Sequence, residues 1–157
     1  MIQEITIKNF LSFKDKVSFN FEATNDKFAE ESQVSSINKQ TRLLRFAIIY
    51  GYNASGKSNL LSTFDFLNYF WSYKPTDLDS GTGVIPFMFD KASINEPSYF
   101  EIIFFVKNTK YCYQLELDQH QVYLEKLSYY KTIQPIMLFE RTLKNGQSDI
   151  QFNPKAD

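Results

Sequence analysis

Alternation of apolar and polar residues marks the start of the chain as a β-hairpin. Ile5 and Ile7 alternate with polar residues in IQEITIKNF, and Val17 and Phe19 do the same a few residues later. A period of two residues is typical of strands that bury one face. The sequence therefore predicts two strands, joined by a polar turn at residues 11–16 (LSFKDK).

A polar segment without periodicity follows this hairpin. Residues 23–42 (ATNDKFAEESQVSSINKQTR) carry only scattered apolar side chains. Such a segment buries too little apolar surface to offset the entropy that is lost when a chain becomes ordered. We expect a long, mobile loop, of the kind that is either functional or disordered.

Residues 43–50 (LLRFAIIY) form an almost unbroken apolar run of strand length. Parallel strands that are covered on both faces have this composition, because neither face meets water. We therefore expect a central, buried, parallel strand in this position.

An amphipathic helix is predicted after the glycine-containing segment that follows. Apolar residues recur at helical spacing, and two phenylalanines widen the apolar face: Leu60, Leu61, Phe64, Leu67 and Trp71, with Phe66 and Phe70. A face this wide predicts packing on more than one side. The helix is expected to end before Lys74 and Pro75, because proline disfavours helical backbone in the residue before it.

The second half of the chain predicts an antiparallel meander. Turn-forming residues 74–85 (KPTDLDSGTGVI) indicate a boundary between two units. Beyond it, four aromatic and β-branched segments of strand length, broken by turn signals, cover residues 99–106, 110–117, 121–129 and 136–142. We expect an α/β fold with a nucleotide-binding lobe at residues 1–85, which includes the mobile loop, and an antiparallel β subdomain at 86–157.

Composition changes this picture little, but it excludes several classes of protein. With 157 residues, 43% of them hydrophobic, the chain can form a core of its own. It has neither an apolar run of about 18 residues nor a secretion signal, so we expect a soluble, cytoplasmic protein. A formal net charge of −1 gives no general attraction to nucleic acid. The single cysteine, Cys112, cannot form an internal disulfide bond and is expected to be inert.

The chemistry is concentrated in residues 51–58 (GYNASGKS), which match the phosphate-binding pattern G-x-x-x-x-G-K-[ST] between the predicted strand and helix. Gly51 and Gly56 supply the backbone freedom that a sharp loop needs. The amides of residues 53–59 are expected to form a cradle for phosphate oxygens. Lys57 is the expected catalytic group on the β- and γ-phosphates, and Ser58 the expected ligand of Mg²⁺. The expected cofactors are therefore ATP and Mg²⁺.

Two stretches, IQEITIKNFLSFKD and LLRFAIIYGYNASGKSNLL, resemble the start of ABC-type ATPase heads in the SMC, RecF and OLD group. Within that group they are most similar to bacterial stand-alone AAA-family ATP-binding proteins, often associated with phage defence. Those proteins begin with a strand that ends in N-F, continue through S-F, and carry G-x-N-A-S-G-K-S-N before the first helix. The matching positions are Asn9, Phe10, Ser12, Phe13, Gly51, Asn53, Ala54, Ser55, Gly56, Lys57, Ser58 and Asn59.

The resemblance implies a P-loop NTPase fold whose first lobe combines a mixed sheet with an antiparallel β subdomain, to which the later stretches IPFMFD, YFEIIFF, KYCYQLELD and VYLEKLSYY are similar. In full-length relatives, two heads enclose ATP, and their closure drives a nuclease, a toxin or a DNA transaction. DNA or RNA and an effector protein are therefore expected partners of the full-length form. Phe13 is an expected contact of adenine.

The motifs that complete such a head are missing from the sequence. Magnesium is normally held by an acidic residue that ends a hydrophobic strand, and no apolar run here ends in Asp-Glu. Glu101, Glu116 and Asp118 precede or alternate with apolar residues and are poor candidates. We expect a chain that stops before the acidic and signature motifs, binds nucleotide, and hydrolyses it poorly. Its uncovered strand edges predict a homodimer.

Two other classes of function stay open. A small-molecule kinase or a GTPase shares the phosphate loop, although the guanine pattern Asn-Lys-x-Asp is absent and a β meander is unlike a kinase lid. A non-enzymatic module would use its tyrosine-rich strands to bind protein or nucleic acid and keep a vestigial loop. His120, the only histidine, falls in a predicted turn without a partner at catalytic spacing.

Overall fold

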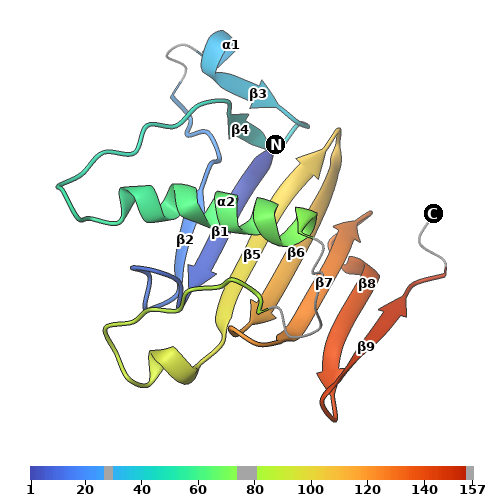
Figure 1. The fold of residues 1–157 in the computed structure, drawn as a ribbon. Helices are drawn as coiled ribbons and strands as arrows, with labels where there is room; N and C mark the ends of the chain where they lie inside the picture. Colours follow the sequence, from blue (N-terminus) through green and yellow to red (C-terminus); the bar gives the residue numbers. More distant parts are fainter. Residues whose placement is uncertain (27–29, 74–80, 155–157) are drawn as a thin grey trace.

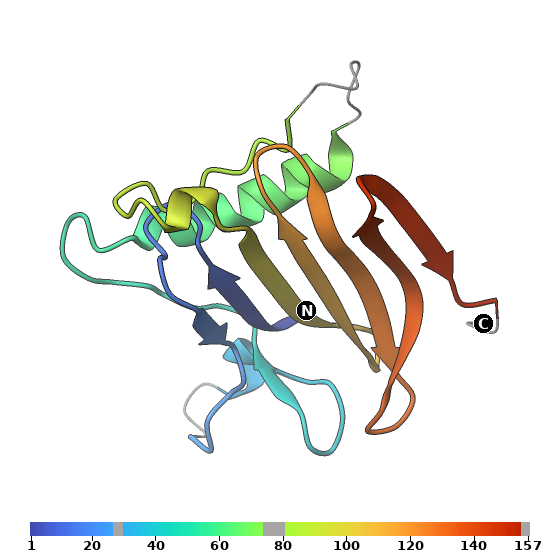
Figure 2. The same cartoon turned by 90° about the horizontal axis from the view of Figure 1, so that it is seen from below.

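The computed structural model describes residues 1–26, 30–73 and 81–154 of the chain. A seven-stranded sheet in the order β2-β1-β5-β6-β7-β8-β9 carries one long helix across a face, and a two-stranded sheet, β3-β4, lies beside it (Figures 1 and 2). The elements are β1 (Ile2–Lys8), β2 (Val17–Asn20), α1 (Glu30–Gln33), β3 (Val34–Ser36), β4 (Arg42–Leu44), α2 (Lys57–Ser72), η1 (Ser93–Asn95), β5 (Ser98–Val106), β6 (Thr109–Leu117), β7 (Val122–Tyr130), β8 (Pro135–Lys144) and β9 (Gln147–Phe152).

The predicted N-terminal hairpin is confirmed. β1 and β2 pair antiparallel, with Ile5 opposite Phe19. On its other edge β1 pairs with β5, which places Ile5 opposite Ile102. Ile5 and Ile7 are fully buried, as their alternation with polar residues predicts.

The predicted helix is also confirmed, and it ends at Ser72. It runs across one face of the sheet, over β1, β5 and β6 (Figures 1 and 2). Phe66 of α2 packs against Phe10 and Phe100, with ring centroids 5.4 and 5.1 Å away. Only one side of the helix is packed, because Leu61 is 64% exposed and Trp71 53% exposed. Lys74 and Pro75 lie outside the described residues.

The expectation of a central parallel strand at residues 43–50 is wrong. Only Arg42–Leu44 is a strand, and it pairs antiparallel with β3. Residues 45–50 have no regular structure, and Phe46, Ile48 and Tyr50 are 66%, 72% and 91% exposed. A parallel strand needs neighbouring strands and a layer on each face. The described residues supply neither around this segment, so its apolar composition does not lead to burial.

The segment that was expected to be a loop, residues 23–42, contains α1, β3 and the first residue of β4. Leu43, just after it, is fully buried and forms a bridge with Glu22 beside β2. Arg42 donates to the carbonyl oxygen of Thr24 over 3.0 Å and forms an ion pair with Glu30 at 3.3 Å. These contacts join the two ends of the stretch to each other and to its flanking residues, and they order a segment whose own periodicity predicts no regular structure.

The antiparallel meander is confirmed, and β9 extends it by one strand. Asn145 and Gly146, with φ angles of 52° and 76°, form the tight turn between β8 and β9. The sequence indicated a boundary between two units near residue 85. Because β1 pairs with β5, strands from both sides of that position belong to one sheet. None of the described helices is both long and apolar enough to cross a membrane.

Candidate functional site

The loop that leads into α2 has the backbone shape of a phosphate-binding turn. Ala54 and Gly56 have left-handed backbone angles, with φ of 63° and 87°. The amide of Ser55 donates to the carbonyl oxygen of Tyr52 over 3.3 Å, which closes a turn inside the loop. Left-handed residues within a tight turn direct neighbouring amides to the same side, and such turns bind anions.

Five amides of this loop have no hydrogen-bond acceptor within the described parts of the chain: Asn53, Ala54, Gly56, Lys57 and Ser58. Two other amides of the expected cradle are already bonded, Ser55 within the turn and Asn59 to the carbonyl oxygen of Gly56 over 3.0 Å. The last three free amides are consecutive and lie at the N-terminus of α2, which is 16 residues long and has no acidic residue in its first turn. The partial positive charge of this helix end is therefore uncompensated.

The side chain of Lys57 bonds to the backbone of its own loop. Its ammonium group donates to the carbonyl oxygens of Gly51 and Tyr52, over 2.9 and 2.6 Å. The hydroxyl oxygen of Ser55 lies 3.4 Å away. The side chain thus folds back over the loop and keeps a positive charge beside the free amides.

Ser58 is exposed on the first turn of α2. Its backbone carbonyl oxygen accepts a hydrogen bond from the hydroxyl group of Ser62 over 3.1 Å. A serine hydroxyl here fits a Mg²⁺ ion that takes its other ligands from phosphate oxygens and water. In the described portion of the chain, no three His, Cys, Asp or Glu side chains gather into a metal site.

The turn after β1 lies directly against this loop, although the two are far apart in the sequence. A side-chain carbon added to Gly56 would lie 2.8 Å from the hydroxyl oxygen of Ser12. Between turn and loop is a cavity of about 300 Å³, lined by Phe13 and Phe19 on one side and by the loop and Leu60 on the other. The fold therefore brings Ser12 and Phe13 together with the phosphate-loop motif.

Asn9 positions that turn, a role that the sequence pattern did not reveal. It is 1% exposed, and its φ of 53° ends β1. Its side-chain amide nitrogen donates to the carbonyl oxygens of Ser93 and Glu96 over 2.7 and 2.8 Å, and its oxygen accepts from the amide of Phe87 over 3.0 Å. Asparagine adopts left-handed backbone more readily than most residues. An asparagine directly after a predicted strand, here Asn9 before Phe10, was therefore the signal in the sequence for a turn at this position.

Two of the acidic side chains that were considered as magnesium ligands accept hydrogen bonds from groups on the sheet and in one of its turns. Glu101 accepts hydrogen bonds from Gln114 and Tyr99, over 2.7 and 2.9 Å. Asp118 accepts from the amide of His120 and the hydroxyl group of Tyr123, over 2.7 and 2.6 Å. His120 is exposed in that turn, as the sequence predicts.

Cys112 lies half-buried on β6. Burial, together with the negative charge of Glu101, raises the pKa of its thiol to about 11. The thiol is therefore protonated at neutral pH, which supports the expectation that this cysteine is inert.

An α/β fold in which a glycine-containing phosphate loop begins a long helix defines the class of P-loop NTPases. Residues 46–156 match the model of a family described as "AAA domain, putative AbiEii toxin, Type IV TA system". The match covers well over half of the chain, so the chain belongs to this family of ATP-binding P-loop ATPases. No curated protein matches the chain.

Proposed function

We propose that the chain binds Mg²⁺-ATP at residues 51–59 and acts as the nucleotide-binding lobe of an SMC- or RecF-like ATPase head. The observation that carries this proposal is the run of free amides at Gly56, Lys57 and Ser58, next to an ammonium group on an uncompensated helix N-terminus. Backbone amides and a helix dipole both favour a multiply charged anion.

Each residue of the loop has a separate role in this proposal. The amides from Asn53 to Ser58 that lack acceptors bind phosphate oxygens, and Asn59 follows them on the first turn of α2. Lys57 exchanges a carbonyl partner for the β- and γ-phosphates and is the catalytic residue. The hydroxyl group of Ser58 orients Mg²⁺, which neutralises charge on the phosphates when it is bound.

The cavity beside the loop supports a place for the nucleobase. It is lined by the rings of Phe13, Phe19, Tyr50 and Tyr52, which provide flat apolar surface. Stacking on such rings does not depend on hydrogen bonds from the base. We propose that adenine contacts Phe13 there.

We also propose a division of work between the two parts of the chain. Residues 1–85 hold the nucleotide, because they contain the loop and the turn that supports it. Within residues 86–157, strands β5 to β9 form most of the sheet on which α2 rests. Hydrolysis would require the acidic strand and signature motif that the resemblance assigns to the second lobe of such heads, so the chain alone hydrolyses ATP poorly.

The biological role that we propose rests on the description of the family. Its description as a putative AbiEii toxin of a type IV toxin–antitoxin system supports a function in defence against phage. We propose that ATP-driven closure of the full-length form acts on an effector protein or on DNA or RNA, and that it operates in the cytoplasm as a homodimer.

The alternative, an interaction module with a vestigial loop, would need accessible rings on the tyrosine-rich strands, where Tyr111, Tyr123 and Tyr130 are partly exposed but two others are not. Tyr113 and Tyr129 are each only 6% exposed, so neither is an accessible stacking platform. Their rings contribute to packing instead: Trp71 meets Tyr113 edge-on at 5.3 Å.

Isothermal titration calorimetry of Mg²⁺-ATP into the chain tests the proposed function. We expect saturable binding that weakens when EDTA removes Mg²⁺ and that competes with ADP. GTP serves as the comparison for the rival GTPase class. No heat of binding at millimolar ATP, with the fold intact by circular dichroism, would refute the proposal.

A further inference from the structure

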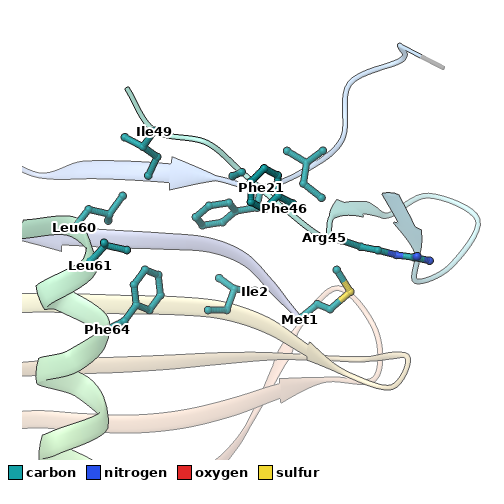
Figure 3. Close-up of a pocket in the computed structure, with 11 residues that line it drawn as sticks. Met1, Ile2, Phe21, Arg45, Phe46, Ile49, Leu60, Leu61 and Phe64 are labelled. Carbon is teal, nitrogen blue, oxygen red and sulfur yellow. The ribbon is translucent and has the colours of Figure 1, made fainter. Parts of the chain in front are cut away.

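Two surfaces with exposed apolar side chains lie at opposite ends of the seven-stranded sheet. The first is a groove of about 370 Å³, which Figure 3 shows with Ile49 on one side and Leu60 and Phe64 of α2 on the other. Leu60 also lines the cavity beside the phosphate loop, so this groove adjoins the nucleotide site. The second is the edge strand β9, on the far side of the sheet from that loop (Figures 1 and 2). The proposed nucleotide site makes no use of β9.

The outer edge of β9 carries free backbone groups. The amide of Asn153 donates to the carbonyl oxygen of Leu138 over 3.0 Å, and β8 pairs with β9 in this same register along its whole length. Hydrogen-bonded and non-hydrogen-bonded positions alternate along an antiparallel pair. The odd-numbered residues of β9 therefore bond to β8. The N–H and C=O groups of the even-numbered residues point away from β8, where the described parts of the chain place no further strand: Ser148, Ile150 and Phe152.

This edge lacks the features that keep exposed strands from pairing. Short strands, charges, bulges and prolines have that effect. The opposite edge strand, β2, has only four residues and follows three charged residues, 14–16. β9 has six residues, contains no proline and pairs with β8 without a bulge. Its side chains Ile150 and Phe152 are 52% and 71% exposed, so the edge is both apolar and open.

The charged side chains near this edge are already paired with one another. The strands β7, β8 and β9 contain six of them, in three ion pairs: Glu125–Arg141 at 3.6 Å, Lys126–Glu140 at 2.7 Å and Lys144–Asp149 at 2.5 Å. A charged group placed against these strands would lose hydration without gaining a free partner. A strand that adds to β9 must therefore be uncharged where it pairs.

We propose that an extended, uncharged segment of another protein adds to β9 as a further strand of the sheet. Its backbone bonds to the free groups of β9, and its apolar side chains, at every second position, pack beside Ile150 and Phe152. Phe152 already contacts the ring of Phe139, with centroids 6.4 Å apart, so the added side chains extend an existing apolar surface.

A second copy of the chain fits this edge less well than a different protein. The proposed homodimer closes around ATP at the phosphate loop, and a further two-fold contact at β9 would join such dimers into an open chain. The added segment therefore belongs to the effector protein of the proposed function. This choice of partner rests on the proposed function, whereas the addition of a strand to β9 does not.

A synthetic peptide tests the strand addition. The probe is a fluorescent peptide of about six residues, blocked at both ends, in which valine alternates with threonine. Fluorescence anisotropy without nucleotide should show saturable binding with a Kd below about 1 mM. The same peptide with a central proline should not bind, because proline removes a strand donor. Absence of binding by the first peptide would overturn the proposal.

Two variants of β9 locate the binding edge. Ile150→Lys places an unpaired charge against the added strand and should abolish peptide binding. Ser148→Pro should do the same, because it removes an N–H that points away from β8, and the fold tolerates proline there. Val106→Lys, which places the same charge at another 52% exposed site of the sheet, is the matched control and should bind as the native chain does. Circular dichroism checks the fold of each variant, and native affinity in both β9 variants would overturn the proposal.

Hydrogen exchange identifies the groups that pair. With the peptide, the amides of Ser148, Ile150 and Phe152 should exchange at least about tenfold more slowly, whereas the odd-numbered amides of β9, already bonded to β8, should change little. Slowing of the same three amides in the chain alone, as its concentration rises from about 5 to 500 µM, would identify a second copy as the occupant and overturn the proposed partner. Because no nucleotide is present, failure of ATP binding leaves these measurements unaffected.

Discussion

Gly56 and Ser12 are in such close contact that a side-chain carbon on Gly56 would lie 2.8 Å from the Ser12 hydroxyl oxygen. The turn after β1 therefore supports the phosphate loop directly. Phe10 of the same turn packs against Phe66 of α2 and Phe100 of β5, and it is 3% exposed. The turn, the loop and the helix pack against one another, so a substitution in the turn or the helix should alter the conformation of the loop.

Gly56→Ala should lower ATP affinity by about tenfold or more, because the added carbon meets Ser12 and alanine is strained at a φ of 87°. Calorimetry measures the loss. Gly146→Ala is the matched control: its φ is 76° but nothing lies within 4 Å of the added carbon. Gly146→Ala should lower the stability of the fold and leave ATP affinity unchanged. Equal ATP affinity in both variants would contradict the proposed role of Gly56.

Lys57→Ala should abolish tight ATP binding and leave the fold intact. Each charge-assisted hydrogen bond to phosphate contributes about 1.5–3 kcal/mol, and the loop is exposed, so the core does not depend on this side chain. Calorimetry with circular dichroism distinguishes the two effects. Lys91→Ala, an exposed lysine beyond α2, is the control and should bind as the native chain does. Unchanged affinity in Lys57→Ala would refute the assignment.

Asn9→Ala should lower the free energy of unfolding by about 2–4 kcal/mol, since it removes the partners of Ser93, Glu96 and Phe87 backbone groups. Urea unfolding followed by tryptophan fluorescence of Trp71 measures the change. Asn20→Ala, which removes an exposed side chain that donates to Glu4 over 3.4 Å and accepts from the amide of Glu22 over 2.7 Å, should cost less because water replaces these exposed partners. Comparable losses in the two variants would mean that Asn9 does not organise the turn.

Cys112 should react slowly with thiol reagents at pH 8 and faster as the pH approaches 11. Burial and the nearby carboxylate of Glu101 raise the pKa of its thiol to about 11, so the reactive thiolate is scarce below that pH. The rate of reaction with Ellman's reagent, in the native and the urea-unfolded chain, measures this. A native rate at pH 8 equal to the unfolded rate would contradict the expected inertness.

Asp118→Ala should lower stability by about 1–2 kcal/mol at pH 7, and the difference from the native chain should disappear in acid. Burial alone would raise the pKa of Asp118, but bonds from Tyr123 and the amides of His120 and Gln121 hold it below its ordinary value. Because the pKa of this carboxyl group is lower in the folded chain than in the unfolded chain, its ionised form stabilises the fold. That stabilisation is complete at pH values above the ordinary pKa, near 4, and is lost as the pH falls through the folded pKa.

Urea unfolding of both proteins between pH 2 and 7, in steps of about one unit, measures this dependence. Asp65→Ala, which removes an exposed carboxylate on α2, is the control variant. A stability difference for Asp118→Ala that is the same at both ends of the range would contradict the role of its ionised form.

The elements that the sequence predicted well are those whose signals are local. Alternating residues place Ile5 and Ile7 in the core, and helical spacing locates α2 to its last turn. The strands of the meander pair with their neighbours in sequence, so short turns such as Asn145-Gly146 determine their order. Periodicity over a few residues contains this information.

The segment from Phe46 to Tyr50 shows where that information ends. Its apolar run indicates a buried strand, but burial requires neighbours that come from elsewhere, and it is exposed here. For residues 30–44 the prediction was wrong in the opposite direction: Arg42 bonds to Thr24 and Leu43 bridges to Glu22, so the two ends of the predicted loop meet and α1, β3 and β4 form between them. The composition of a segment indicates how much apolar surface it can bury. It does not indicate whether other elements of the fold lie against that surface.

The sequence by itself determined the phosphate-loop residues from Gly51 to Ser58, the helix that follows them and the antiparallel meander, because these depend on neighbours in the chain. Tertiary structure alone decided that Asn9 anchors the turn and that Ser12 rests on Gly56. It also decided that the strand-forming residues before the loop stay exposed. Contacts between residues far apart in the chain depend on how α2 and the sheet pack, which no local pattern specifies.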